Sequence, residues 1–159
     1  MSLNQFRVVQ PGEGITYDFP ALAMTLVFLA TSEDSDGEHS VFESIHQPGS
    51  GAPLHIHHRQ DETAYVVEGQ FLIRKGHEAV RRIGAGTYAH FPKGQAHAFK
   101  CVGDTPGKLL FWMRPGGYEK FFARAQQLLG SGPPDMEALA ALGKEYDADI
   151  VGPMIEEDR

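Results

Sequence analysis

Histidine and carboxylate side chains gather in one short stretch of the sequence, from Pro53 to Gln70. His55 and His57 are two residues apart, and alternate side chains of a β-strand lie on the same face. Both imidazoles would therefore point in one direction if this segment is a strand. Glu62 follows five residues after His57, beyond a polar segment in which the chain can turn. Two neutral nitrogens with a nearby carboxylate are ligands suited to a transition metal ion.

A further histidine lies far downstream. His97, in "PKGQAHAF", stands at the start of a later segment with β character. Three imidazoles and one carboxylate at one point would leave one or two positions open on a five- or six-coordinate ion. Open positions indicate ligand capture or catalysis, whereas structural metal sites are closed.

The glycines and prolines around these residues resemble the two signature motifs of the cupin superfamily. The first motif matches at every position, which are Gly49, His55, His57, Glu62 and Gly69. The second matches at Gly86, Pro92, Gly94 and His97, but has Cys101 where the family usually has Asn. The resemblance implies a jelly-roll fold and one divalent transition metal ion (Fe, Mn, Ni, Cu or Zn) held by the residues that match its ligands: His55, His57, Glu62 and His97.

The resemblance also suggests a reaction. The segment Pro115–Ala125, "PGGYEKFFARA", is similar to single-domain cupins described as quercetin-dioxygenase-like. We therefore expect a metal-dependent dioxygenase that acts on a small aromatic or enol-type molecule. Glu62 is the expected catalytic base, on the condition that an apolar environment raises its pKa.

The pattern around the motifs predicts an all-β fold, a jelly-roll β-barrel or sandwich. Glycine and proline recur at short intervals between residues 11 and 117, and the runs between them have β character. The expected strands are Met24–Ala30, Ser40–His46, Thr63–Glu68, Phe71–Lys75, Ala79–Ile83, Tyr88–Phe91, His97–Val102 and Lys108–Arg114. Eight aromatic or sulfur-containing residues are candidates for an apolar lining: Phe42, Phe71, Tyr88, Phe91, Phe99, Phe111, Trp112 and Met113.

The hydrophobic period changes after Gly117. Apolar residues then recur at intervals of three and four from Tyr118 to Leu129, which predicts an amphipathic helix ended by Gly130. Asp135 is placed to cap a second helix, and the acidic tail after it is expected to be frayed. Residues 1–115 are thus the expected β-barrel, and residues 116–159 a helical extension of the same domain that packs on its outside or on a partner.

Composition narrows the class of protein. The 159 residues carry a formal net charge of −7, which argues against binding to nucleic acid or to anionic membranes. The most apolar stretch, Ala21–Ala30, is too short for a membrane helix. The single cysteine, Cys101, cannot form an internal disulfide, and a cytoplasmic location is expected. Exposed sheet edges favour a homodimer, and the expected ligand is a small-molecule substrate.

Several alternatives remain open. Asp61 competes with Glu62 for the carboxylate role, while His46, His58, His77 and His90 are expected to be ordinary strand or turn residues. The same metal site would also serve an isomerase or epimerase of a sugar-like metabolite, which would need Arg, Lys and Gln around the pocket. A third alternative is a small-molecule-binding domain without turnover, since fold and ligands alone do not establish catalysis.

Overall fold

Short strands separated by glycine-rich turns form two sheets in the computed structural model, which describes residues 5–157. The first sheet has six strands in the spatial order β1 (Ile15–Phe19), β2 (Met24–Ala30), β3 (Ser40–His46), β10 (Gly107–Arg114), β5 (Asp61–Glu68) and β8 (Tyr88–Phe91). The second has five strands in the order β11 (Ala148–Ile150), β4 (Gly51–His57), β9 (His97–Val102), β6 (Gln70–Lys75) and β7 (Arg81–Gly84).

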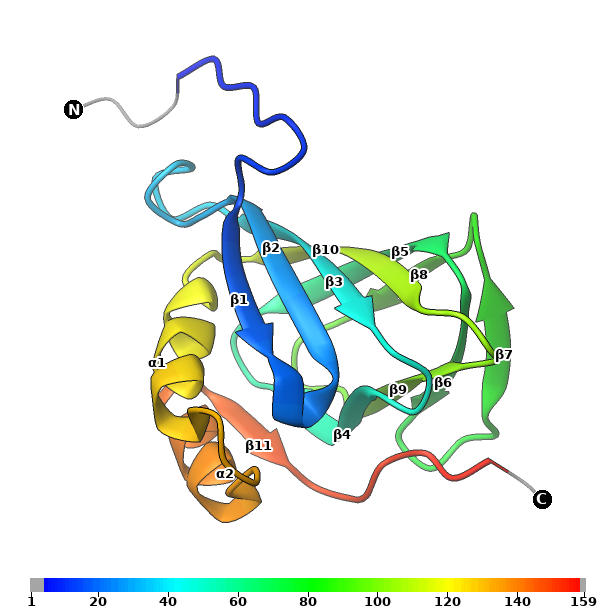
Figure 1. Ribbon diagram of the computed structural model, residues 1–159. Coiled ribbons are helices and arrows are strands. Elements are labelled where there is room, and N and C mark those ends of the chain that lie inside the picture. Colours follow the sequence, from blue (N-terminus) through cyan, green and yellow to red (C-terminus); the bar gives the residue numbers. More distant parts are fainter. Residues whose placement is uncertain (1–4, 158–159) are drawn as a thin grey trace.

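The two sheets pack face to face as a sandwich (Figure 1). All strand pairs of both sheets are antiparallel. The sheets do not close on one another, so the expected barrel is corrected to a sandwich with edge strands β1 and β8 on one sheet and β11 and β7 on the other. A short 3-10 turn, Pro20–Leu22, joins the first two strands.

Aromatic residues on the inner faces hold the sheets together. Phe28, Phe42 and Phe111 are direct cross-strand neighbours on β2, β3 and β10. Their rings stack with centroids 4.7 and 5.2 Å apart. Phe99 of the other sheet contacts Phe111 at 5.6 Å, which joins the two layers in one core. Cys101 is fully buried in the same core, where burial raises the pKa of its thiol, and it acts as a small apolar residue.

Two helices cover one side of the sandwich (Figure 1). Helix α1 (Glu119–Leu129) contacts β1, helix α2 (Met136–Glu145) contacts β11, and the helices contact each other. The caps agree with the prediction, because Gly130 ends α1 and the Asp135 side chain accepts a hydrogen bond from the Ala138 amide at 2.9 Å. The helices therefore bridge one edge of each sheet and leave the β7 and β8 edges on the other side.

The expected strands were correct in type, and four of them have the expected bounds: β2, β3, β8 and β9. Two short edge strands were not expected, β1 before the apolar segment and β11 after the helices. The segment 116–157 thus contributes a strand to the sheet that carries β4. The expected apolar lining was wrong at Trp112, which is 42% exposed on the outer face, whereas Tyr88 is 65% exposed but lines a cavity at the β7 and β8 edges.

Ile155, the apolar residue at the start of the acidic tail, packs against the sandwich. Ile155 is 1% exposed and packs with Leu54, Leu72 and Val102 on the outer face of the second sheet. The expectation of a frayed tail is therefore wrong for Ile155, because an uncovered apolar patch on the sheet favours burial of this side chain. Residues 158 and 159 lie outside the described residues. Within residues 5–157, no helix is both long enough and apolar enough to span a membrane.

Candidate metal centre

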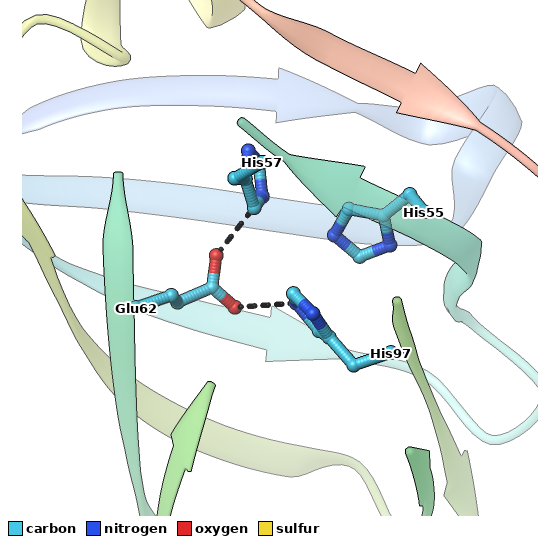
Figure 2. A group of neighbouring side chains, drawn as sticks. All are labelled: His55, His57, Glu62 and His97. Atoms are coloured by element: carbon cyan, nitrogen blue, oxygen red, sulfur yellow. Dashed lines mark ion pairs between the residues drawn. The ribbon is translucent and has the colours of Figure 1, made fainter. Parts of the chain in front are cut away.

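The four residues expected to bind a metal meet between the two sheets (Figure 2). His55 and His57 come from β4, and His97 comes from β9 directly opposite His55 in the strand register. Glu62 comes from β5 in the other sheet. Strand alternation explains why His55 and His57 point in the same direction. Leu54, the residue before His55, faces the outside of the sheet. Gly51 allows β4 to lie close to β9, because a Cβ there would overlap the Phe99 carbonyl oxygen.

The donor atoms form a compact cluster. One nitrogen of each histidine and one oxygen of Glu62 all lie within 4.8 Å of one another. The Glu62 carboxylate faces two rings, with Oε2 at 3.2 Å from His57 Nε2 and Oε1 at 3.5 Å from His97 Nε2. His57, Glu62 and His97 are buried, whereas His55 is only partly buried. His55 is thus the member of the cluster nearest to solvent.

Backbone carbonyls orient two of the imidazoles. The Nδ1 atom of His55 lies 2.7 Å from the Pro53 carbonyl oxygen, and that of His97 lies 3.1 Å from the Gln95 carbonyl oxygen. A carbonyl only accepts, so each Nδ1 carries the hydrogen and each Nε2 is directed to the cluster. Burial, together with the nearby His97 and His57, lowers the pKa of His55 to about 3, which keeps its Nε2 lone pair available near pH 7.

Glu62 is held as a carboxylate. Burial raises the pKa of Glu62, but the close contacts of its carboxylate with the His57 and His97 rings outweigh burial and place the pKa well below its usual range. Glu62 has the opposite effect on His97. Burial lowers the pKa of His97, but the close contact with Glu62 and its negative charge raise this pKa overall. The raised pKa expected for Glu62 is therefore corrected: its environment favours an anionic metal ligand over a strong base.

These residues fit a metal ion. Nε2 of His97, which faces Glu62, is buried and has no hydrogen-bond partner, which is costly unless another group satisfies it. Two ligands at about 2.1 Å from one ion are at most about 4.2 Å apart. Donors within 4.8 Å of one another need only small side-chain rotations to reach a common ion. A set of three imidazoles and one carboxylate suits a divalent first-row transition metal.

Aromatic rings pack against two of the histidines. Tyr118, at the start of α1, meets the His57 ring edge to face with centroids 4.8 Å apart. Phe91 of β8 stacks on His97 at 4.3 Å with an angle of 15° between the rings. Burial, with a contribution from the charge of Glu62, raises the pKa of Tyr118, so this phenol stays protonated. Tyr118 was not expected at the site, because the spacing of apolar residues in the predicted helix indicates only a core position for Tyr118.

The other candidate ligands lie elsewhere. Asp61 is next to Glu62 but points away, and its carboxylate accepts a hydrogen bond from the Lys93 amide at 2.9 Å. His58 is exposed and pairs with Asp149 at 2.8 Å. The prediction that Glu62 and not Asp61 joins the histidines agrees with this geometry.

The remaining histidines are also separate from the cluster. His90 lies on the outer face and contacts the Thr63 hydroxyl at 3.1 Å, and His77 is in an exposed turn. His46 is fully buried between the hydroxyls of Ser44 and Ser50, at 2.6 and 2.9 Å. Burial lowers the pKa of His46 to about 4, so its role is that of a neutral core residue.

A cavity of about 300 Å³ lies at the β7 and β8 edges, and of the four cluster residues His97 alone is in its wall. Phe91, Ile73, Ile83 and Ala89 supply apolar surface to it. Of the Arg, Lys and Gln residues that the isomerase alternative would need around the pocket, Gln95 lines this cavity, while Arg59 and Lys93 line a separate surface groove. Lys75 and Arg81 also line the cavity and were missed; alternation places Arg81 on the same face of β7 as Ile83, but it does not tell which face points inward.

Comparisons with known proteins agree with this fold. Residues 42–113 match the family described as "Cupin domain", a range that contains all four residues of the cluster. None of the curated proteins matches the sequence.

Solved structures with different described activities share the fold. A predicted oxalate decarboxylase from Thermotoga maritima is 19% identical, with a TM-score of 0.62 over 69% of this chain and 99% of that one. A polyketide cyclase from Streptomyces resistomycificus is 18% identical, with a TM-score of 0.61 over 69% and 80% of the two chains. A sugar phosphate isomerase of the cupin superfamily from Silicibacter pomeroyi is 23% identical, with a TM-score of 0.52 over 64% and 69%. Identities this low support the fold alone. The matched family and the sandwich fold show that this chain contains a cupin domain, over residues 42–113.

Proposed function

We propose that this protein is a metal-dependent dioxygenase that acts on a small aromatic or enol-type substrate. The observation that carries the proposal is the cluster itself: four buried or partly buried donors within 4.8 Å, with His97 in the wall of a cavity. A closed structural site would have no need for access of this kind. The apolar surface of Phe91, Ile73 and Ile83 suits a largely apolar guest.

Each residue of the cluster has a distinct part. His55, His57 and His97 would hold the ion, with Pro53 and Gln95 carbonyls keeping two of the rings oriented. A divalent transition metal bound there supplies Lewis-acid stabilisation of a substrate enolate or phenolate and a reaction site for dioxygen. Glu62 would contribute negative charge to the ion's environment and is the one carboxylate of the cluster that could accept a proton from the substrate.

The proposed reaction balances without an added reductant. The enol or phenol hydroxyl loses its proton to Glu62, dioxygen is the oxidant, and both of its oxygen atoms end in the product. The low pKa of Glu62 makes it a weak base, so this transfer would need a bound metal ion to lower the pKa of the substrate hydroxyl first. Phe91, stacked on His97, keeps water from one side of the ring.

The test combines metal content with oxygen uptake. Elemental analysis of the purified protein should find about one transition metal ion per chain, and His57→Ala should lose it while His58→Ala retains it. The metal-loaded protein is then supplied with flavonols or with enolisable ketones in an oxygen electrode. Oxygen consumption that disappears in His57→Ala supports the proposal. Metal binding without oxygen consumption for any of these compounds contradicts it.

A second candidate function is isomerisation or epimerisation of a sugar-like metabolite at the same centre. The polar part of the cavity wall, Lys75, Arg81 and Gln95, favours it, and one structural neighbour is a sugar phosphate isomerase. Product formation from sugar phosphates without oxygen uptake would support this function. Thermal stabilisation by a metabolite without any turnover would instead support a binding protein.

A further inference from the structure

The cavity beside His97 has a cationic wall that the proposed chemistry does not use. Its lining residues include members of β6, β7, β8 and β9. The β7 and β8 edges lie on the side of the molecule away from the helices (Figure 1). Its volume, about 300 Å³, corresponds to about ten water molecules, so it accommodates a single-ring molecule.

Strand register fixes which side chains face this cavity. Lys75 of β6 lies directly opposite His97 of β9, and Arg81 of β7 lies directly opposite Ile73. Directly opposed residues in an antiparallel pair have side chains on the same face of the sheet. Because His97 and Ile73 face the interior, Lys75 and Arg81 are on the interior face too.

The two cations differ in their partners. Lys75 forms an ion pair with Glu78 at 3.2 Å, and both side chains are well exposed at the mouth of the cavity. Arg81 makes no ion pair and no side-chain hydrogen bond with any residue from 5 to 157. Among the described residues that line the cavity, Glu78 alone carries a carboxylate. The wall therefore has an excess of positive charge, with Arg81 as the available donor.

Apolar surface separates this donor from the metal cluster. Ile73 of β6 and Ile83 of β7 lie diagonally across the strand pair, since Ile83 is directly opposite Phe71, and Ala89 and Phe91 belong to the opposite sheet. A guest in this cavity would meet Arg81 at one end, apolar surface along its body, and His97 at the other end, where Lys75 is the cross-strand partner of His97 and is paired with Glu78. A planar guanidinium binds a carboxylate with two parallel hydrogen bonds, which gives direction as well as affinity.

We propose that the cavity binds a small organic acid, with its carboxylate on Arg81, its apolar body across Ile73 and Ile83, and its reactive end toward His97. This assignment rests on the proposed function only in that the reactive end reaches the metal cluster. It names the substrate class of that site: a carboxylic acid with one ring or a chain of similar size. Lys75 adds long-range attraction for the anion.

The test compares a carboxylate with a neutral compound of the same shape. Phenylacetate and phenylacetamide are titrated calorimetrically into the metal-loaded protein. Phenylacetate should bind at least about tenfold more tightly, as expected for a charge-assisted pair. Arg81→Met should remove this preference and leave phenylacetamide binding unchanged, which also shows that the variant is folded.

A matched control is available on the same strand. Arg82 faces the other side of β7 and bonds to the Gln70 side chain at 3.0 Å, so Arg82→Met should keep the full preference for phenylacetate. Equal or undetectable binding of the two compounds, or a preference that persists in Arg81→Met, overturns the proposal. Displacement of phenylacetate by an equal concentration of inorganic phosphate also overturns it, since the site would then suit phosphate esters. Because these readouts require no turnover, they are independent of the oxygen-uptake test.

Discussion

Glu62 and His97 face one another from opposite sheets, with Oε1 of the carboxylate 3.5 Å from Nε2 of the ring. Neither strand alone holds the pair, since β5 and β9 come together only when the sandwich is packed. Any ion that binds both residues therefore binds the folded chain and not the unfolded one. Metal binding and stability are linked through this contact.

The carboxylate is expected to dominate metal affinity. Partners that only orient a ligand contribute about 10–100-fold to metal affinity, so Glu62→Gln, which removes an anionic donor, should lower it by more than about 100-fold. Competition titration of Ni²⁺ against a chromophoric chelator measures the change. Asp61→Asn is the matched control, because Asp61 accepts from the Lys93 amide outside the cluster. A comparable loss in Asp61→Asn would show that the neighbouring carboxylate is the ligand.

Added metal should stabilise the fold. An ion at 100 times its dissociation constant stabilises the folded state by about 2.7 kcal/mol, which calorimetry detects as a higher unfolding temperature. His57→Ala should abolish this increase, whereas His58→Ala should retain it because His58 is exposed and paired with Asp149. An increase of the same size in His57→Ala would place the binding site elsewhere.

Glu119 predicts how stability depends on acid. Its carboxylate is buried and accepts hydrogen bonds from the amides of Ser32 and Gly117, at 2.9 and 3.1 Å, and from two serine hydroxyls. Burial raises the pKa of Glu119, but these bonds outweigh it and lower the pKa below its ordinary value of 4.5. A lowered folded-state pKa means that the stability it contributes is present above pH 4.5 and is lost as the pH falls through the folded-state pKa.

Glu119→Gln should therefore cost about 2 kcal/mol at neutral pH and flatten the decline in stability below pH 4.5. Urea unfolding at several pH values from 3 to 7 measures both effects. Glu137→Gln, at an exposed position of α2, should leave both unchanged. A decline in the Glu119→Gln variant as steep as that of the natural sequence would show that other groups cause the acid sensitivity.

The C-terminal segment should contribute stability without affecting the metal centre. Ile155→Ala should destabilise the fold by about 2–4 kcal/mol, because Ile155 is fully buried against Leu54 and Val102 on the outer face of the second sheet. Val151→Ala, at a 48% exposed position, should cost less than about 0.5 kcal/mol. Metal content should be unchanged in both, since the cluster lies on the inner face. A change in unfolding free energy equal to that of Val151→Ala would indicate that the tail is not packed in solution.

The predictions from sequence succeeded where a local rule was sufficient. Alternation along a strand predicted that His55 and His57 share a face, and the motif spacing predicted Glu62 over Asp61 and His97 over His90. The caps at Gly130 and Asp135 depend on residues close in the chain, and both are where they were expected. The short edge strands β1 and β11 were missed because three to five residues carry little periodicity.

By itself, the sequence determined the strand and helix types and the identity of the four clustered residues, because side-chain period and motif spacing are properties of the chain alone. Only the tertiary structure decided that the sheets stay open, that Ile155 covers an outer face, and that Arg81 joins the wall of the cavity beside His97. It also reversed the direction expected for the pKa of Glu62, since close contacts with histidines of two distant strands outweigh burial. The physical reason is the same for these four features: each depends on which segments, distant in the chain, pack together, and a local sequence pattern does not contain that information.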